Sequence, residues 1–414
     1  MSDTQAMLDS GDIAGLIRYL QVNADSMELA EVAKLMEGVA AISGFDDIRE
    51  AAAALARAQG PQQLHDFGYA CLERGVAVLA ILAFRRALEI MPGEPTLLIN
   101  LVNSLQEENR HAEALAALEP HVGSMDPWPA RYLLAYSALF AGEITRAERE
   151  AGRLPTPDSD WLPARDRLAR MIARARAARA VSPLDDRDLR GWHFALSGGL
   201  LITISPFGFE GMNGRYGFIS DTFASCRSSL DHLQQILAAT GRQPASVGLL
   251  PDRSSRILGL AAAQLLELPA EPFVRGRADV LVIAYDLNEA KPPGLWERAD
   301  GQVLFEHASC WTARRVSADV IGFLHQVVTS PWAERLKLSP NREVETIPPD
   351  ERPTEELAAE IVRAASQSVD GEADAPQDSD AALLRLAKAV GSQWLKGPRD
   401  PVFSLGPVAS NRFH

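Results

Sequence analysis

The sequence predicts a multidomain protein in which all-α helical hairpins are followed by an α/β domain with a mainly parallel sheet. Residues up to about Arg179 are rich in Ala, Leu, Glu and Arg with helical periodicity. From Gly191 onward, apolar runs typical of strands alternate with helical stretches, which indicates a parallel sheet. The composition changes near residues 181–184. We therefore expect a repeat domain at 1–180, an α/β domain at 185–340, and an acidic linker, a helix and a flexible tail at 341–414.

The charge and composition of the whole chain limit the classes of partner that we expect. Its 414 residues carry a formal net charge of −14, which repels phosphate backbones, so we expect no nucleic-acid partner. No run approaches the roughly 18 apolar residues of a membrane span, and the first residues lack a secretory signal pattern. We expect a cytoplasmic protein with no membrane partner. Cys71, Cys226 and Cys310 are few and far apart, which argues against disulfides and against a thiolate metal site, and no cofactor is identifiable.

Short helices joined by tight breaks fill the amino-terminal region. Breaks containing Gly or Pro at 43–44, 60–61, 91–93 and 126–127 indicate antiparallel helix pairs. We expect Gly68 and Ala80 to let the paired helices approach closely, and Phe67 and Phe84 to fill the space between them. The spacing of large, small, turn and proline residues is most regular from 61 to 92. These residues are Leu64, Phe67, Gly68, Cys71, Gly75, Ala80, Phe84, Ala87 and Pro92.

This spacing resembles the tetratricopeptide repeat family, whose unit has about 34 residues. Degenerate copies follow: one keeps Leu98, Leu101 and Leu105, and a third keeps Leu134 and Ala135. The resemblance implies three or four hairpins with a concave face that binds a protein or peptide partner. The alternative is that the array packs only on its own second domain.

The α/β region is divided into elements by its apolar runs. We expect strands at 192–197 and 200–205, a helix at 222–240, a strand at 247–250, a helix at 255–266, strands at 279–285 and 303–306, and a helix at 318–328. The first two strands are expected to form an antiparallel hairpin turning at Gly198 and Gly199, because a parallel crossover needs more chain. Residues 348–380 are predicted to be a flexible linker with a short helical stretch near 355–365, and an amphipathic helix at 381–395 is expected to dock.

Polar residues follow three of these strands, at the edge where an open parallel sheet binds its ligands. We expect them to converge there, with Asp286 and His307 as candidate catalytic residues. The candidate ligand-binding residues at this edge are Asp252, Arg253, Ser254, Ser255 and Asn288. Each also has a structural interpretation. In this interpretation, Asp252 or either serine caps the helix that begins there, and Arg253 pairs with Asp286 instead of binding an anion. His307 is then a hydrogen-bonded core residue.

Two further features bear on ligand binding. The loop at 205–217 is rich in Gly and is either a lid that presents Asn213, Arg215 and Tyr216 to a ligand, or a set of tight turns. Residues 247–286 resemble the phosphoribosyltransferase fold over a small part of the chain. The acidic pair and the phosphate-binding loop of that family are missing after Asp286, so neither phosphoribosyl transfer nor a magnesium site follows from the resemblance.

We therefore expect an interaction protein, a tetratricopeptide scaffold or adaptor with an appended α/β ligand-binding domain. The alternative is a group transferase acting on a small anionic substrate, with Arg253 or Arg215 binding the anion and Asp286 or His307 acting as base. A third hypothesis is a regulator whose α/β domain senses a small molecule and alters partner binding by the repeats.

Overall fold

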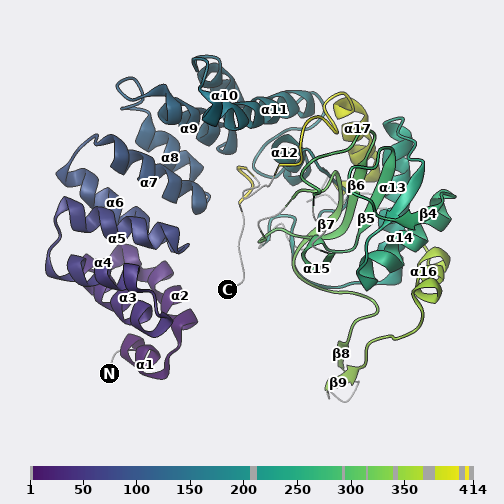
Figure 1. The fold of residues 1–414 in the computed structure, drawn as a ribbon, viewed down its shortest axis with the longest axis horizontal. Coiled ribbons are helices and arrows are strands. Elements are labelled where there is room, and N and C mark those ends of the chain that lie inside the picture. Colours follow the sequence, from purple (N-terminus) through teal and green to yellow (C-terminus); the bar gives the residue numbers. More distant parts are fainter. Residues whose placement is uncertain are drawn as a thin grey trace. The chain divides into compact units, whose positions relative to one another are not determined.

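The chain forms two compact units, Met1–Arg165 and Asp166–Phe413. The structure, a computed structural model, describes residues 3–205, 212–290, 294–313, 316–338, 344–366, 378–400 and 406–409. Helices dominate the first unit and a parallel sheet the second, which confirms the predicted fold class (Figure 1). Within those ranges, no helix has both the length and the apolar character that crossing a membrane requires.

The first unit consists of consecutive short helices that pack as antiparallel pairs. Contacts join α3 to α4, α5 to α6, α7 to α8 and α9 to α10, and each pair also contacts the next. The helices are α1 (Asp3–Ser10), α2 (Ile13–Asn23), η1 (Ala24–Ser26), α3 (Leu29–Ser43), α4 (Asp46–Arg57), α5 (Pro61–Glu73), α6 (Ala77–Ile90), α7 (Pro95–Glu107), α8 (His111–Leu118), α9 (Pro127–Phe140), α10 (Ile144–Ala151) and η2 (Ser159–Trp161). Helix α11 (Leu162–Ala178) follows, and the boundary between the units falls within it.

The close approach predicted within the α5/α6 pair is confirmed. Phe67, Ala80 and Phe84 are fully buried, and the Phe84 ring lies directly over Gly68. A Cβ atom at Gly68 would come within 2.9 Å of that ring, closer than side chains tolerate. The small residue is therefore required by the aromatic residue that faces it.

The second unit is built on a seven-stranded sheet in which every strand pair is parallel. The strand order is β1-β7-β6-β5-β3-β4, and β2 also pairs with β7. The strands are β1 (Leu200–Leu201), β2 (Tyr216–Ser220), β3 (Ser246–Leu249), β4 (Ala270–Pro272), β5 (Val280–Ala284), β6 (Val303–Cys310) and β7 (Val320–Thr329); β8 (Arg335–Leu338) and β9 (Val344–Ile347) form a separate antiparallel hairpin. The helices are α12 (Leu189–Ser197), α13 (Phe223–Ala239), α14 (Arg253–Leu266), α15 (Leu287–Ala290), α16 (Thr354–Arg363) and α17 (Asp380–Val390).

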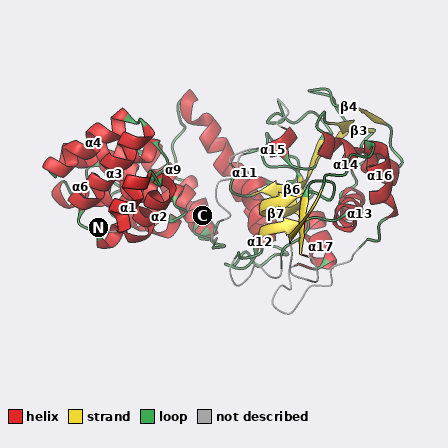
Figure 2. Ribbon diagram, turned by 90° about the horizontal axis from the view of Figure 1, so that it is seen from below, coloured by secondary structure: helices red, strands yellow, loops and turns green. Residues whose placement is uncertain are grey.

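Helices α13 and α14 cover one face of this sheet. Helix α13 packs on β6, and α14 packs on β3 and β5 (Figure 2). Helix α16 buries Leu357 and Ile361 against this helix layer and confirms the predicted helical stretch, while residues 367–377 of the predicted linker lie outside the described residues. Helix α17 docks on α13 as expected, with Leu383 and Leu386 buried.

Two sequence expectations are wrong. Residues 192–197, expected as a strand, lie in α12, whose residues are buried on every side, so the segment shows no helical periodicity in its polarity. The predicted hairpin at Gly198 therefore does not form; Gly198, at φ +83°, ends the helix, and β1 pairs in parallel with β7. Residues 318–328, expected as a helix, contain strand β7, whose first six residues are buried and which pairs with β6 on one side and with β1 and β2 on the other.

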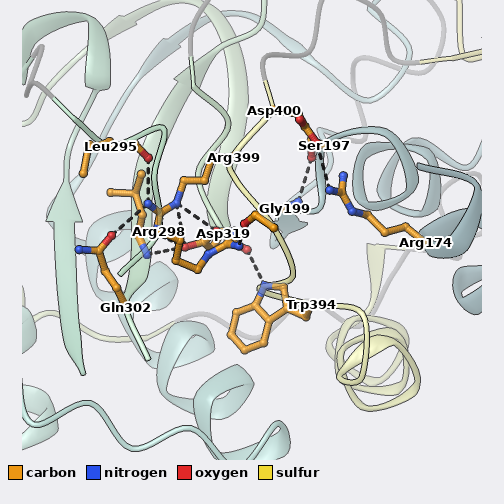
Figure 3. Close-up of polar contacts among 12 residues, drawn as sticks. Arg174, Ser197, Gly199, Leu295, Arg298, Gln302, Asp319, Trp394, Arg399 and Asp400 are labelled. Carbon is orange, nitrogen blue, oxygen red and sulfur yellow. Dashed lines mark hydrogen bonds and ion pairs between the residues drawn. The ribbon is translucent and has the colours of Figure 1, made fainter. Parts of the chain in front are cut away.

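Residues 396–400, expected in a flexible tail, are instead anchored in the second unit. Arg399 is buried and pairs with Asp319 at the start of β7, and its guanidinium also donates to the Leu295 carbonyl (Figure 3). Next to it, Asp400 accepts a hydrogen bond from Arg174 of α11 at 3.1 Å. These buried charges attach residues 399–400 to the start of β7 and to α11.

Burial makes His193 of α12 a source of acid sensitivity. Burial, and after it the charge of Arg215, lowers the pKa of His193 to about 4. Because the unfolded chain keeps a pKa of about 6.5, it binds the proton first as the pH falls, and stability is lost from about pH 6.5 down to about pH 4. Between about pH 7 and pH 5, we expect the free energy of unfolding, measured by urea titration, to fall by about 2 kcal/mol more in the wild type than in the His193→Leu variant. Equal losses in the two proteins would contradict this assignment.

Candidate functional site

The strand order places a topological switch point between β3 and β5. From β3 the chain runs through α14 to β4 on one side, and it then returns to β5 on the other side of β3. Open α/β sheets bind ligands beyond the carboxyl ends of the strands at such a point. Residues 250–256 and 285–289 lie there, and they include six of the predicted site residues.

The predicted residues after β3 are engaged within the protein. Asp252 caps α14 by accepting a hydrogen bond from the Ser255 backbone N–H at 2.8 Å. Ser254 Oγ accepts from Trp332 Nε1 at 3.0 Å, and Ser255 Oγ accepts from the Tyr285 N–H at 2.9 Å. These contacts support the capping interpretation for Asp252 and give the two serines positioning roles.

Arg253 also binds the chain itself. Its guanidinium donates to the carbonyl oxygens of Asp350 and Arg352 at 2.6 and 2.9 Å. Those residues lie just before α16, so Arg253 holds the start of that helix near α14.

Asp286 and His325 lie close together beyond the carboxyl end of β5. One Asp286 carboxylate oxygen accepts from the Asn288 N–H at 2.7 Å, and the other lies 3.6 Å from His325 Nε2. His325 is only 2 % exposed, and neither ring nitrogen has a hydrogen-bond partner among the described residues. Partial burial, then the charge of Asp286 and, more weakly, that of Asp252, raise the pKa of Glu289. The predicted convergence of Asp252 and Asp286 is thus seen, with Glu289 and His325 added.

His307 belongs to a second cluster, formed by Asp221, Cys226, Tyr285 and His307. Its Nε2 lies 2.9 Å from Asp221 Oδ2 and 3.6 Å from Cys226 Sγ. Tyr285 donates its hydroxyl to the same Asp221 oxygen at 2.8 Å. All four side chains are buried. His307 is therefore a core residue, as in its structural interpretation, and it does not join Asp286.

The charge balance of this cluster follows from its burial. Burial alone would raise the pKa of Asp221, but His307 and the hydrogen bonds to the carboxylate hold that pKa below its ordinary value. Burial and the neighbouring Asp221 raise the pKa of the Cys226 thiol well above its ordinary value. Without a further positive charge, the thiol stays protonated.

Arg215, predicted to bind a ligand, is also buried within the protein. Its guanidinium donates to carbonyl oxygens of Met212, Val408 and Ala409 and lies 5.2 Å from the centre of the Trp311 ring. Burial lowers its pKa to about 9. Arg215 thus attaches residues 408–409 to the domain, and residues 206–211 of the predicted lid lie outside the described residues.

Three candidate functional residues were not identified from the sequence. His325 was hidden in a segment expected to be helical, and Asp221 and Cys226 stand far from His307 without a recognisable spacing. The one available signal was Asp221-Thr222, an acidic residue directly before a helix cap. Neither a protein-family model nor a curated protein matches the sequence. Function must therefore be inferred from the geometry.

Proposed function

We propose that the first unit is a tetratricopeptide-type module that binds a protein or peptide partner, and that the second unit is an appended α/β ligand-binding domain. The observation that carries this proposal is a set of aromatic and amide side chains on the first helices of successive pairs. Helix α5 contacts α7, and α7 contacts α9, so these first helices lie side by side. We name their shared surface the first-helix face, formed by His65, Tyr69, Asn100, Tyr132 and Tyr136.

The side chains of this face are arranged for contact across helices. His65 stacks on Tyr69, one turn along α5, and lies 3.4 Å from the Asn100 side-chain amide of α7. On α9, Tyr132 lies against Tyr136 with a ring separation of 6.0 Å. The two tyrosines occupy the same repeat positions as His65 and Tyr69. Tyrosine and histidine rings offer apolar surface with a polar edge, which suits peptide binding at low entropic cost.

The group-transferase alternative receives less support. It needs Arg253 or Arg215 to hold an anion, and both guanidinium groups donate to backbone carbonyl oxygens of the chain itself. It also needs His307 or Asp286 as base, and His307 is enclosed in the core. For the α/β domain, the Asp286 and His325 pair at the switch point favours binding of a small ligand there.

Peptides selected from a random displayed library against the full-length protein test the proposal. We expect Tyr69→Ala to weaken the affinity of a selected peptide at least about tenfold, because a buried aromatic contact at an interface contributes about 1–2 kcal/mol or more. Fluorescence polarisation with a labelled peptide measures this change.

A matched control comes from the second helix of the same pair. Ile90 of α6 is 47 % exposed, against 48 % for Tyr69, and it lies outside the first-helix face. Ile90→Ala should leave the affinity unchanged. Equal weakening by both substitutions, or by neither, would overturn the assignment of the binding surface.

A further inference from the structure

Asp221, Cys226 and His307 bring three different metal-binding groups together inside the second unit. One donor atom of each residue lies within 4.8 Å of the other two, and all three residues are buried. Asp221 Oδ2 lies 2.9 Å from His307 Nε2 and 3.4 Å from Cys226 Sγ, which in turn lies 3.6 Å from His307 Nε2. We infer that these residues form a structural binding site for a divalent cation of the zinc class.

The distances fit a tetrahedral centre. Metal bonds of about 2.0 Å to nitrogen and oxygen and about 2.3 Å to sulfur separate the donors by roughly 3.3–3.6 Å. Both separations that involve the Cys226 sulfur already match this range. Only the carboxylate and the imidazole must move apart, by a few tenths of an ångström. A thiol, an imidazole and a carboxylate also form a donor set that favours zinc over magnesium or calcium, which prefer oxygen donors alone.

Rigid elements hold each donor. His307 lies on β6, between β5 and β7, and Cys226 lies in the first turn of α13. Asp221 directly precedes Thr222, the cap of α13, and its other carboxylate oxygen accepts from the Thr222 N–H at 2.8 Å, which turns Oδ2 toward the cluster. Donors fixed in this way lose little conformational entropy when a metal binds.

Tyr285 supplies the outer shell. Its hydroxyl donates to Asp221 Oδ2, and its ring lies 5.3 Å from the His307 ring. Hydrogen bonds of this kind orient metal-binding carboxylates. The fourth ligand is then one enclosed water.

Charge and burial identify the role of the metal. Binding displaces the thiol proton of Cys226 to solvent, and the metal takes the place of the proton that His307 Nε2 shares with Asp221. A thiolate and a carboxylate then neutralise the two positive charges. Because all three donors are buried, the ion serves to tie α13 to β6 and is not accessible to a substrate. Tyr285 is a positioning residue for this site.

Metal analysis of untagged full-length protein from zinc-supplemented cells tests the inference. We expect about one zinc per chain, with X-ray absorption showing one sulfur donor at about 2.3 Å and nitrogen or oxygen donors at about 2.0–2.1 Å. After exchange for Co²⁺, a thiolate charge-transfer band should appear and should be absent from Cys226→Ser. Cys71→Ser and Cys310→Ser are matched controls that should retain the band. Tyr285→Phe should weaken zinc affinity about 10–100-fold in competition with a chelator.

Several results would overturn the inference. If the protein stays folded but takes up no stoichiometric zinc when titrated with excess metal, the cluster is held by hydrogen bonds alone. A zinc shell without sulfur, or a cobalt band that survives Cys226→Ser, places the metal elsewhere. The X-ray absorption measurement uses wild-type protein, so it decides the question even where Cys226→Ser does not fold.

Discussion

Replacing Asp319 by alanine should lower the free energy of unfolding of the second unit by about 3–5 kcal/mol, because it leaves a buried guanidinium without its partner. Arg399 donates to both Asp319 carboxylate oxygens, and Arg298 and the Leu304 N–H donate to the same carboxylate (Figure 3). Burial alone would raise the pKa of Asp319, but the charges of Arg399 and Arg298 hold it below its ordinary value. Urea unfolding followed by circular dichroism measures the loss.

An exposed ion pair in the same unit provides the control. Arg275 and Glu297 approach to 3.5 Å with most of both side chains exposed. Surface pairs of this kind contribute little, so Glu297→Ala should change the free energy of unfolding by less than about 0.5 kcal/mol. If Asp319→Ala and Glu297→Ala have similar small effects, the buried network does not anchor the carboxyl-terminal segment.

Replacing Gly322 by alanine should destabilise the second unit by about 3 kcal/mol or more. Gly322 lies on β7, beside β6, and an added Cβ would come within 2.3 Å of the His307 carbonyl oxygen on β6. That oxygen belongs to the backbone of the neighbouring strand, so relief requires the two strands to separate. Thermal unfolding of the variant should show a midpoint well below that of the wild type.

Gly391, at the end of α17, provides the matched glycine. An added Cβ there would meet only ordinary contacts at 3.5 and 3.6 Å, and its backbone is right-handed helical. Gly391→Ala should therefore be neutral or slightly stabilising. A Gly322→Ala protein as stable as the Gly391→Ala protein would show that β6 and β7 are not packed as described.

Local patterns were sufficient to predict much of the fold. Alternating apolar and helical runs identified β3, α14, β5 and α13, because each combines a clear period with a cap or break at its ends. Strand β7 and helix α12 were assigned wrongly because most of their residues are buried. A segment buried on every side shows no alternation of apolar and polar residues, and that alternation is what distinguishes a helix from a strand in a sequence.

The candidate site was predicted in part for a similar reason. Asp252 and Asp286 follow neighbouring strands, so strand order alone brings them to one edge. His307 did not join them because Asp221 and Cys226 hold its imidazole. Glu306 accepts a hydrogen bond from the Leu287 N–H of α15, whereas the next residue, His307, meets Cys226 of α13. A difference of one residue in the strand thus separates the two clusters.

We propose that the first unit binds a partner and that the second unit binds a small ligand. In the second unit, the predicted arginines are occupied by carbonyl oxygens and the predicted serines by backbone or indole N–H groups. In the first unit, Tyr69 remains 48 % exposed although tyrosine contributes strongly to binding when it is buried at an interface. This contrast is why the interaction role is placed on the helical hairpins.

Hydrogen–deuterium exchange of the full-length protein, with and without a selected peptide, tests the central claim most directly. The proposed first-helix face predicts added protection in α5, α7 and α9, with α13, α14 and the sheet of the second unit unchanged. Protection confined to the switch point between β3 and β5, with α5, α7 and α9 unchanged, would contradict the claim that the helical hairpins bind the partner.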